Sequence, residues 1–423
     1  MGFRPSARSL GFEARCRSGK MNRYKRSQFL SFDIGTVEEL DLEAFLRGRV
    51  SMRQGSRLTA FSAISGERFP VSMEDVQGLL QVPSDQWTAL AEVAERSGLA
   101  ESRLEELAHL GALVSTREGE IETKLRDRED RLTRQQWSPE AARYHFATRL
   151  EEKRQPEGPR DIAHLSANSE EKAREVVALR GAPPPAFHRR EGEFVPLPEV
   201  EPRPGRPFFE VLESRRTVRG FDDSISLPLE QLSMLVRWVF GARGIARLTE
   251  GVELLHKTSP SGGSLHPIEA YPLVLRVEGL ETGLYHIETR SRGLRRILRL
   301  DLDAAQALAI ESSRGQLYAG QAACLFVLTA RWGRNFWKYR RSSRTYRVVL
   351  KDLGHLSQTF YLTAAELGLG AFYTGAIWPL PLEELLGLDS EDEAILGICG
   401  CGLADEGNEL GLPFEPIDQG AGK

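Results

Sequence analysis

Three arginines and a hydroxyl side chain stand within five residues in the C-terminal half, in the run SRRTVRG at 214–220. In an extended segment Arg215, Thr217 and Arg219 point to one side and Arg216 to the other. Guanidinium groups match pairs of phosphate oxygens, and a short hydroxyl adds a further donor. The cluster therefore indicates a phosphate-binding segment, although a solvated basic turn would have the same composition.

A second segment, SPSGGSLHP at 259–267, is rich in small residues. Small residues let backbone N–H groups approach a planar or anionic ligand closely. The segment is not a G-x-G-x-x-G turn that opens a helix, so a dinucleotide-binding Rossmann site is not supported. A plain surface turn is the alternative. The candidate ligand-lining residues are Pro260, Ser261, Gly262, Gly263 and Ser264.

A third segment, 337–375, begins with the pair Lys338-Tyr339. A long helix is predicted from about 344 to the glycines Gly368 and Gly370. The residues 371–375 then predict a strand end at which Thr374 and Gly375 could present an N–H group to a ligand. The predicted buried side of the helix consists of Leu350, Leu353, Leu356, Phe360, Leu362 and Ala365.

The remaining chemistry-bearing residues do not predict a metal site. The eight histidines are dispersed without H-x-x-x-H or H-E-x-x-H spacing. Cys399 and Cys401 are too close together for the usual zinc or redox pairings. His355, on the long helix, is interpreted as a packed or capping group rather than a proton carrier. The scattered cysteines fit a reducing cytoplasm and not a disulfide scaffold.

Length and composition limit the class of protein. A chain of 423 residues predicts two or three domains, and 41% hydrophobic with 27% charged residues is typical of a globular protein. The net charge of −4 gives no overall attraction to nucleic acid. No apolar run approaches the ~20 residues that span a bilayer, so no membrane association is expected.

The N-terminal part predicts a small separate domain. Residues 1–28 form a basic tail, expected to be disordered, and residues 29–125 predict a winged-helix-like domain. Its first helix is expected to begin after Ser84 as N-cap. The second helix, 100–110, carries three acidic residues and one arginine, which would repel phosphates. Peptide docking or a structural role is therefore favoured over DNA binding.

A connector follows at 126–207. Residues 117–135 are densely charged and predict a solvated helix or exposed connector, and a further helix is expected to open at Ser138. Residues 183–207 hold eight of the 22 prolines and predict a linker or a strap over a surface. The next strand, 268–277, contains Pro272, which predicts a sheet edge or the strand's beginning. The last domain is expected at 208–423.

In their order and spacing the three C-terminal segments resemble the nitroreductase-like flavoproteins. More narrowly they resemble the SagB/ThcOx-type dehydrogenases that modify ribosomally made peptides. The resemblance covers about residues 208–402, and its motifs are RRTVRGF, PSGGSLHPIEAY, WKY with RTYR, and DLGHLSQTFYLTAAELGLG. It implies an α+β fold, an antiparallel sheet flanked by helices, and a homodimer with FMN at the subunit interface.

The resemblance also implies roles for matching residues. The 215–219 cluster would hold the FMN phosphate and ribityl chain, the 260–264 loop would line the isoalloxazine, and Thr374 with Gly375 would lie near its N5/O4 edge. Lys338 and Tyr339 match the catalytic pair of azoline-oxidising relatives. Two departures stand out. Four residues rather than two, from Arg340 to Ser343, separate Tyr339 from Arg344. The C-terminal basic residue that often helps to hold the phosphate in relatives is not evident after Gly402, where Asp405, Glu406 and Glu409 are acidic. Arg334, Arg344 or Arg347 could then assist the phosphate.

We therefore expect a cytoplasmic FMN-dependent oxidoreductase that acts on a precursor peptide, with azoline-to-azole dehydrogenation as the leading reaction. A lysine with a lowered pKa could take the proton while the flavin takes the hydride. Flavin-dependent reduction of dehydroamino acids, a general small-molecule nitroreductase and a non-catalytic flavin- or peptide-binding partner remain alternatives. A modification-complex partner enzyme is a further expectation.

Overall fold

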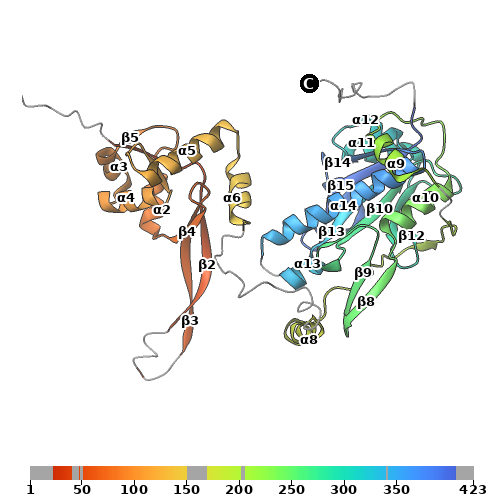
Figure 1. The fold of residues 1–423 in the computed structure, drawn as a ribbon, viewed down its shortest axis with the longest axis horizontal. Helices are drawn as coiled ribbons and strands as arrows, with labels where there is room; N and C mark the ends of the chain where they lie inside the picture. Colours follow the sequence, from red (N-terminus) through yellow and green to blue (C-terminus); the bar gives the residue numbers. More distant parts are fainter. Residues whose placement is uncertain are drawn as a thin grey trace, which may run out of the picture. The chain divides into compact units, whose positions relative to one another are not determined.

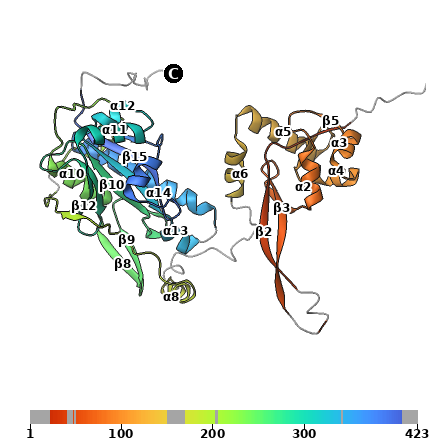
Figure 2. The same ribbon diagram turned by 180° about the vertical axis from the view of Figure 1, so that it is seen from behind.

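The computed structural model describes residues 22–40, 47, 51–149, 169–201, 205–339 and 342–405. Its contacts divide the chain into two compact units, residues 1–152 and 153–423 (Figures 1 and 2). Residues 1–21 of the expected basic tail lie outside the described residues. The prediction of a disordered tail is wrong for Arg23–Arg26, which form strand β1. Its backbone is paired on both sides, with β5 and with β6.

The first unit combines two small antiparallel sheets with five helices among the described residues. One sheet has the order β5-β1-β6, and the other the order β2-β3-β4. Leu79, Val93, Leu104 and Leu107 are fully buried in its core. The strands are β1 (Arg23–Arg26), β2 (Leu30–Leu40), β3 (Met52–Ser62), β4 (Glu67–Pro70), β5 (Thr88–Ala89) and β6 (Leu113–Ser115). The helices are α2 (Met73–Leu80), α3 (Leu90–Ser97), α4 (Glu101–His109), α5 (Glu120–Arg134) and α6 (Pro139–Ala147).

The expected order of helix, glycine turn, helix and strand is present in α3, α4 and β6. The first of these helices does not begin after Ser84, as predicted, but at Leu90. The preceding residues Thr88–Ala89 pair with β1 as a short strand, and this sheet pairing replaces the first helical turn. Ser138 does cap α6, because its hydroxyl accepts a hydrogen bond from the Ala141 N–H.

The second unit is built on a seven-stranded sheet with the order β14-β15-β13-β10-β11-β12-β7. Every neighbouring pair is antiparallel, and helices cover both faces, so the expected α+β class is confirmed. The Pro-rich segment contributes the edge strand β7 (Glu193–Val195). The other six strands of this sheet are β10 (Ile268–Val274), β11 (Gly283–Glu288), β12 (Gly293–Arg299), β13 (Cys324–Arg331), β14 (Gly370–Thr374) and β15 (Glu393–Gly402). A separate two-stranded antiparallel sheet consists of β8 (Gly244–Thr249) and β9 (Val252–His256).

The helices fall on two sides of this sheet. Residues of α10, the π-helical turn η1 (Val236–Phe240) and α14 pack in one core, and residues of α11, α12 and α15 pack in the other. Among the described residues no helix is long and apolar enough to cross a bilayer. The helices are α8 (Ser169–Arg180), α9 (Phe208–Ser214), α10 (Leu229–Leu235), α11 (Leu302–Ser312), α12 (Leu317–Gln321), α13 (Trp332–Tyr339), α14 (Arg344–Glu366) and α15 (Leu380–Leu386).

Strand β10 is central in the sheet, so the edge position predicted from Pro272 is wrong. Pro272 pairs with Phe326 of β13, whereas β11 pairs with β10 only at Leu273 and Val274. The proline therefore lies where β11 has not yet joined the ladder. A residue without an N–H group is tolerated at that point because no neighbour on that side needs it.

Helix α14 is the long helix predicted from the sequence, and it ends before Gly368, whose φ is +71°. Its buried stripe includes Val349, Leu353, Leu356, Phe360 and Ala364. Leu350 was predicted to be buried but is 43% exposed, because it stands one position off this stripe. Leu362 and Ala365 are only half-buried. The stripe leaves other faces of the helix free for polar contacts.

Substitution of Phe360 by alanine tests the anchoring of α14. Phe360 is fully buried, with its ring 5.2 Å from that of Phe326 and 6.5 Å from that of Phe240. We expect Phe360→Ala to lower the free energy of unfolding by about 3–5 kcal/mol in urea denaturation. Leu350→Ala, on the same helix, is the control and should cost less than about 1 kcal/mol. Equal losses for the two variants would contradict this packing.

Candidate functional site

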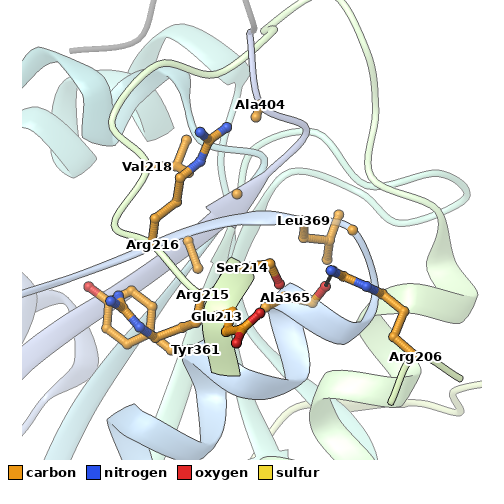
Figure 3. A pocket seen from close by; sticks show the side chains of 13 residues that line it. Arg206, Glu213, Ser214, Arg215, Arg216, Val218, Tyr361, Ala365, Leu369 and Ala404 are labelled. Carbon is orange, nitrogen blue, oxygen red and sulfur yellow. Dashed lines mark hydrogen bonds between the residues drawn. The ribbon is translucent and has the colours of Figure 1, made fainter. Parts of the chain in front are cut away.

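Two arginines of the 215–219 cluster lie in an open cleft of about 760 Å³ (Figure 3). Arg215 and Arg216 line the cleft directly after α9, together with Val218. The opposite wall is the end of α14 and the start of β14, from Ala365 to Ala371. The backbone holds the two walls together, because the Val218 N–H donates to the Ala371 carbonyl at 2.8 Å. The cleft therefore joins the segment predicted to bind phosphate to the glycine-rich turn after α14.

Tyr361 organises one side of this cleft. Its hydroxyl accepts a hydrogen bond from the Tyr373 N–H at 2.8 Å and lies 3.2 Å from the Thr217 hydroxyl. The Arg215 guanidinium lies over the Tyr361 ring, 5.6 Å from its centre. Such stacking directs a guanidinium while leaving its N–H groups available for a ligand. Thr217 is thus tied to the tyrosine, and Arg215 faces the cavity beside it.

Arg219, Thr374 and Gly375 form a second group near α12. The Arg219 guanidinium lies 5.8 Å from the centre of the Tyr318 ring, and Tyr318 in turn hydrogen-bonds to Gln316. Thr374 is buried, and its hydroxyl lies 3.3 Å from the Gln316 amide and accepts the Ala376 N–H. Gly375 is exposed. These three residues do not line the cleft of Arg215 and Arg216.

The glycine-rich segment forms a third group in an unusual backbone conformation. Gly263, Ser264 and His266 all have positive φ angles, of 70°, 55° and 45°. Two of them are not glycine, and such conformations cost free energy unless the surroundings enforce them. The loop closes on itself because the His266 N–H donates to the Ser261 hydroxyl oxygen at 2.9 Å. Gly262–Ser264 form a short 3₁₀ turn at its tip.

Asp352 of α14 holds this loop from one side. The Ser261 hydroxyl donates to one carboxylate oxygen at 2.6 Å, and the Gly262 N–H donates to the other at 3.0 Å. Arg334 holds it from the other side, because its Nε and Nη2 groups donate to the Leu265 carbonyl at 3.1 and 2.9 Å. The strained loop is therefore clamped between α13 and α14.

Lys338 and Tyr339 lie against the tip of this loop. A Cβ atom placed on Gly263 would be 2.5 Å from the Lys338 Nζ and 3.2 Å from the Tyr339 hydroxyl. A side chain here would displace the end of the flexible Lys338 side chain, and the φ of +70° independently favours glycine at this position. The structure therefore brings the predicted catalytic pair together with the predicted ring-binding loop. Of the residues inserted after Tyr339, Arg340 and Arg341 lie outside the described residues.

The surroundings change the acidity of both members of the pair. Lys338 is exposed as a residue, yet neighbouring protein atoms desolvate its ammonium and lower its pKa from the usual value. Burial raises the pKa of Tyr339, and the negative charge of Asp352 raises it further. A lysine with a lowered pKa can act as a base nearer to neutral pH, while a phenol with a raised pKa keeps its proton.

Arg334 is not available for a phosphate, contrary to one expectation. It is 1% exposed, and its partners are the backbone carbonyls of Leu265, Pro184 and Glu253. No carboxylate lies within ion-pair distance of it among the described residues, and burial lowers its pKa to about 10. This buried cation ties the Pro-rich segment, the β9 strand and the glycine-rich loop to α13.

The arginine cleft and the glycine-rich loop contact different parts of α14. Tyr361 serves the cleft, and Asp352 serves the loop. The two residues are nine positions apart on the helix, which corresponds to about 14 Å along its axis. A phosphate-bearing planar cofactor fits the chemistry of these residues, since one group is cationic and the other is a small-residue platform. Among the described residues no cluster of metal-ligating side chains occurs.

Three residues of these groups were not singled out in the sequence. Arg206 lines the cleft beside Ala365, and its isolated position before α9 gave no signal. Tyr361 gave no signal in the sequence beyond being an aromatic residue of the predicted helix. Asp352 offered a signal, because an acidic residue there interrupts the apolar stripe between Val349 and Leu353.

Comparisons with known proteins add sequence relatives. Residues 212–403 match the Nitroreductase family. The chain is 32% identical over 177 residues to a candidate nitroreductase of Methanocaldococcus jannaschii, covering 42% of this chain and 82% of that protein. It is 29% identical over 167 residues to the trifolitoxin-processing protein TfxB of Rhizobium leguminosarum bv. trifolii. That match covers 38% of this chain and 44% of TfxB, so the chain spans less than half of that protein's length.

Among solved structures, one similar chain comes from the E. coli microcin synthetase McbBCD complex with truncated pro-MccB17 bound. It has a TM-score of 0.40 and 21% sequence identity, with 59% of this chain and 99% of that chain covered.

The half-buried imidazole of His266 predicts a pH dependence of stability. Burial, aided by the charge of Lys257, lowers the pKa of His266 from 6.5 to about 3. The unfolded chain takes up a proton below about pH 6.5 that the folded loop excludes, so this residue makes stability fall as the pH drops from 6.5 towards 3. We expect His266→Asn, which tolerates a positive φ, to reduce the slope by up to about 1.4 kcal/mol per pH unit in urea denaturation between pH 6 and 4. An unchanged slope would contradict a neutral imidazole in the folded loop.

Proposed function

Because the chain belongs to the nitroreductase family, we propose that it is an FMN-dependent oxidoreductase acting in the maturation of a ribosomally made peptide. The observation that carries this proposal is the Lys338–Tyr339 pair held against the strained 261–266 loop. A general surface turn would not need a buried carboxylate and a buried guanidinium to fix it. The arginine-lined cleft beside the same helix α14 supports the same cofactor.

The residues divide naturally between the parts of FMN. Arg215 and Arg216 would bind the phosphate in the cleft. Thr217 and Arg219, which do not line the cleft, would contact the ribityl chain. The loop residues would support the isoalloxazine, with Thr374 and Gly375 at its N5/O4 edge. When bound, FMN supplies a hydride acceptor. The loop residues in this assignment are Pro260, Ser261, Gly262, Gly263 and Ser264.

Lys338 would act as the base and Tyr339 as its orienting partner. Oxidation of an azoline to an azole removes one hydrogen from each of two adjacent carbons, one as a proton and the other as a hydride. The lowered pKa of Lys338 makes its neutral amine accessible, so that Nζ can take the proton. The raised pKa of Tyr339 keeps its hydroxyl as a hydrogen-bond donor towards the substrate.

The peptide substrate is proposed from two observations. The chain carries a separate N-terminal unit that a reductase of small molecules would not need. One of its relatives is named as a trifolitoxin-processing protein. The N-terminal unit would dock the precursor peptide, and an enzyme that forms the azoline ring would be the partner that acts first.

A homodimer is part of the proposal. The cleft and the loop are served by parts of α14 about 14 Å apart. A second copy would allow the loop of one protomer to complete the cleft of the other, as the family resemblance implies. Reduction of a dehydroamino acid uses the same groups in the opposite direction and is the second candidate reaction.

The phosphate assignment predicts a ligand-dependent effect of Arg215→Gln. Loss of a charge-assisted hydrogen bond costs about 1.5–3 kcal/mol, so FMN should bind at least about tenfold more weakly. Riboflavin lacks the phosphate, so the variant should bind it with the wild-type affinity. Both affinities are measured by fluorescence titration of the apoprotein. Arg299→Gln, an exposed arginine of β12, is the control. Equal weakening of both ligands by Arg215→Gln would contradict the assignment.

The base assignment predicts a large effect of Lys338→Ala on turnover. We expect turnover of an azoline-containing peptide to fall about 10²- to 10⁴-fold while the FMN content stays at the wild-type level. Lys338→Arg keeps the positive charge but cannot serve as a base at neutral pH, so it should be nearly as inactive. Wild-type turnover by either variant would rule out Lys338 as the base.

A further inference from the structure

We infer that Asp352 is a positioning residue that fixes the 261–266 loop and the Tyr339 side chain relative to each other. The inference rests on the proposed function and assigns a task to a residue outside the predicted site. Asp352 lies on α14 and is 5% exposed. The apolar stripe of this helix packs in the core, and the Asp352 carboxylate is directed at the loop. A buried carboxylate needs partners that compensate for its lost hydration, and here the loop supplies them.

The first part of this task is mechanical. Both carboxylate oxygens of Asp352 accept loop donors, the Ser261 hydroxyl at 2.6 Å and the Gly262 N–H at 3.0 Å. The Ser261 hydroxyl oxygen also accepts a hydrogen bond from the His266 N–H. The Ser261 side chain therefore links Asp352 to the far end of the loop. Ser264 and His266 are held at positive φ although neither is glycine, a conformation that costs free energy unless neighbouring groups fix it. The Asp352 carboxylate thus fixes the conformation of the 261–266 loop without a bound ligand.

The tip of the loop connects Asp352 to the Lys338–Tyr339 pair. Gly262 also packs against Val348 of α14, where no Cβ would fit. Its neighbour Gly263 is the residue against which Lys338 and Tyr339 lie. A shift of the loop by about 1 Å would therefore move the platform relative to the proton-handling groups, and such shifts are costly in catalysis.

The second part of the task is electrostatic. The charged or titratable groups around Tyr339 are Lys338 on its own helix and Asp352 on α14, and His355 lies near Asp352 one turn further. Burial is the main cause of the raised pKa of Tyr339, and the negative charge of Asp352 adds to it by disfavouring the phenolate. The residue that shapes the loop therefore also helps to keep Tyr339 protonated.

Asp352→Asn tests the mechanical part in the full-length protein. The amide keeps the shape of the carboxylate but loses its charge and one acceptor. We expect FMN and lumiflavin, which is the ring system alone, each to bind about tenfold more weakly, because both depend on the loop. The midpoint potential and the visible spectrum of the bound FMN should also change. Lys351→Gln, the exposed neighbour on the same helix, should leave all of these values at the wild-type level.

A tyrosinate titration tests the electrostatic part without any turnover. We expect the absorbance of Tyr339 phenolate to develop at lower pH in Asp352→Asn than in the wild type, because the opposing charge is gone. The Tyr339→Phe variant in each background identifies the signal. A purely structural role of Asp352 would not move this titration in a folded, FMN-loaded protein.

The outcomes separate this inference from the proposed function. If the wild type binds neither FMN nor lumiflavin, the proposed function fails. If the wild type binds both and Asp352→Asn matches it in affinity, potential and tyrosinate titration, the inference alone fails. If Asp352→Asn does not fold, Ser261→Ala removes only the hydroxyl link. It should then weaken FMN and lumiflavin equally, and wild-type affinities for both would overturn the inference.

Discussion

The burial of helix α14 against the sheet is the constraint on which both groups of candidate residues depend. Phe360, Leu353 and Leu356 fix one face of the helix in the core. Because this face is buried, the helix cannot rotate about its axis. Asp352 is therefore directed at the glycine-rich loop, and Tyr361 at the arginine cleft. One apolar stripe thus positions Asp352 and Tyr361, and with them the two groups of polar residues, about 14 Å apart on the same helix. Precise placement on a helix is easier to maintain than placement on a loop.

The loop itself illustrates how a site can hold an unfavourable conformation. Ser264 and His266 occupy the left-handed region although neither is glycine. The compensation comes from two buried charges, the Asp352 carboxylate and the Arg334 guanidinium, each satisfied by hydrogen bonds rather than by an ion pair with the other. Arg334 also holds the carbonyl of Pro184. The Pro-rich segment is therefore part of the support of the site and not a spacer alone.

The sequence predicted local features well where periodicity and composition decide the structure. The length of α14, the glycine stop after it, the strand at 370–374 and the small-residue loop all follow from such patterns. Predictions failed where partners distant in the sequence decide. Thr88 and Ala89 form a strand because β1 lies beside them. Pro272 is tolerated in a central strand because β11 pairs with β10 only after it. Asp352 and Tyr361 acquire their importance only through contacts across 90 and 144 residues of chain, which no local pattern encodes.

The visible absorption spectrum of the purified full-length protein, with identification of the cofactor released on denaturation, tests the central claim most directly. A flavin spectrum and release of FMN would be the result expected from an arginine cleft and a strained small-residue platform on one helix. A colourless protein that cannot be reconstituted with FMN would contradict the account. The cleft and the loop would then have to serve another phosphate-bearing or planar ligand.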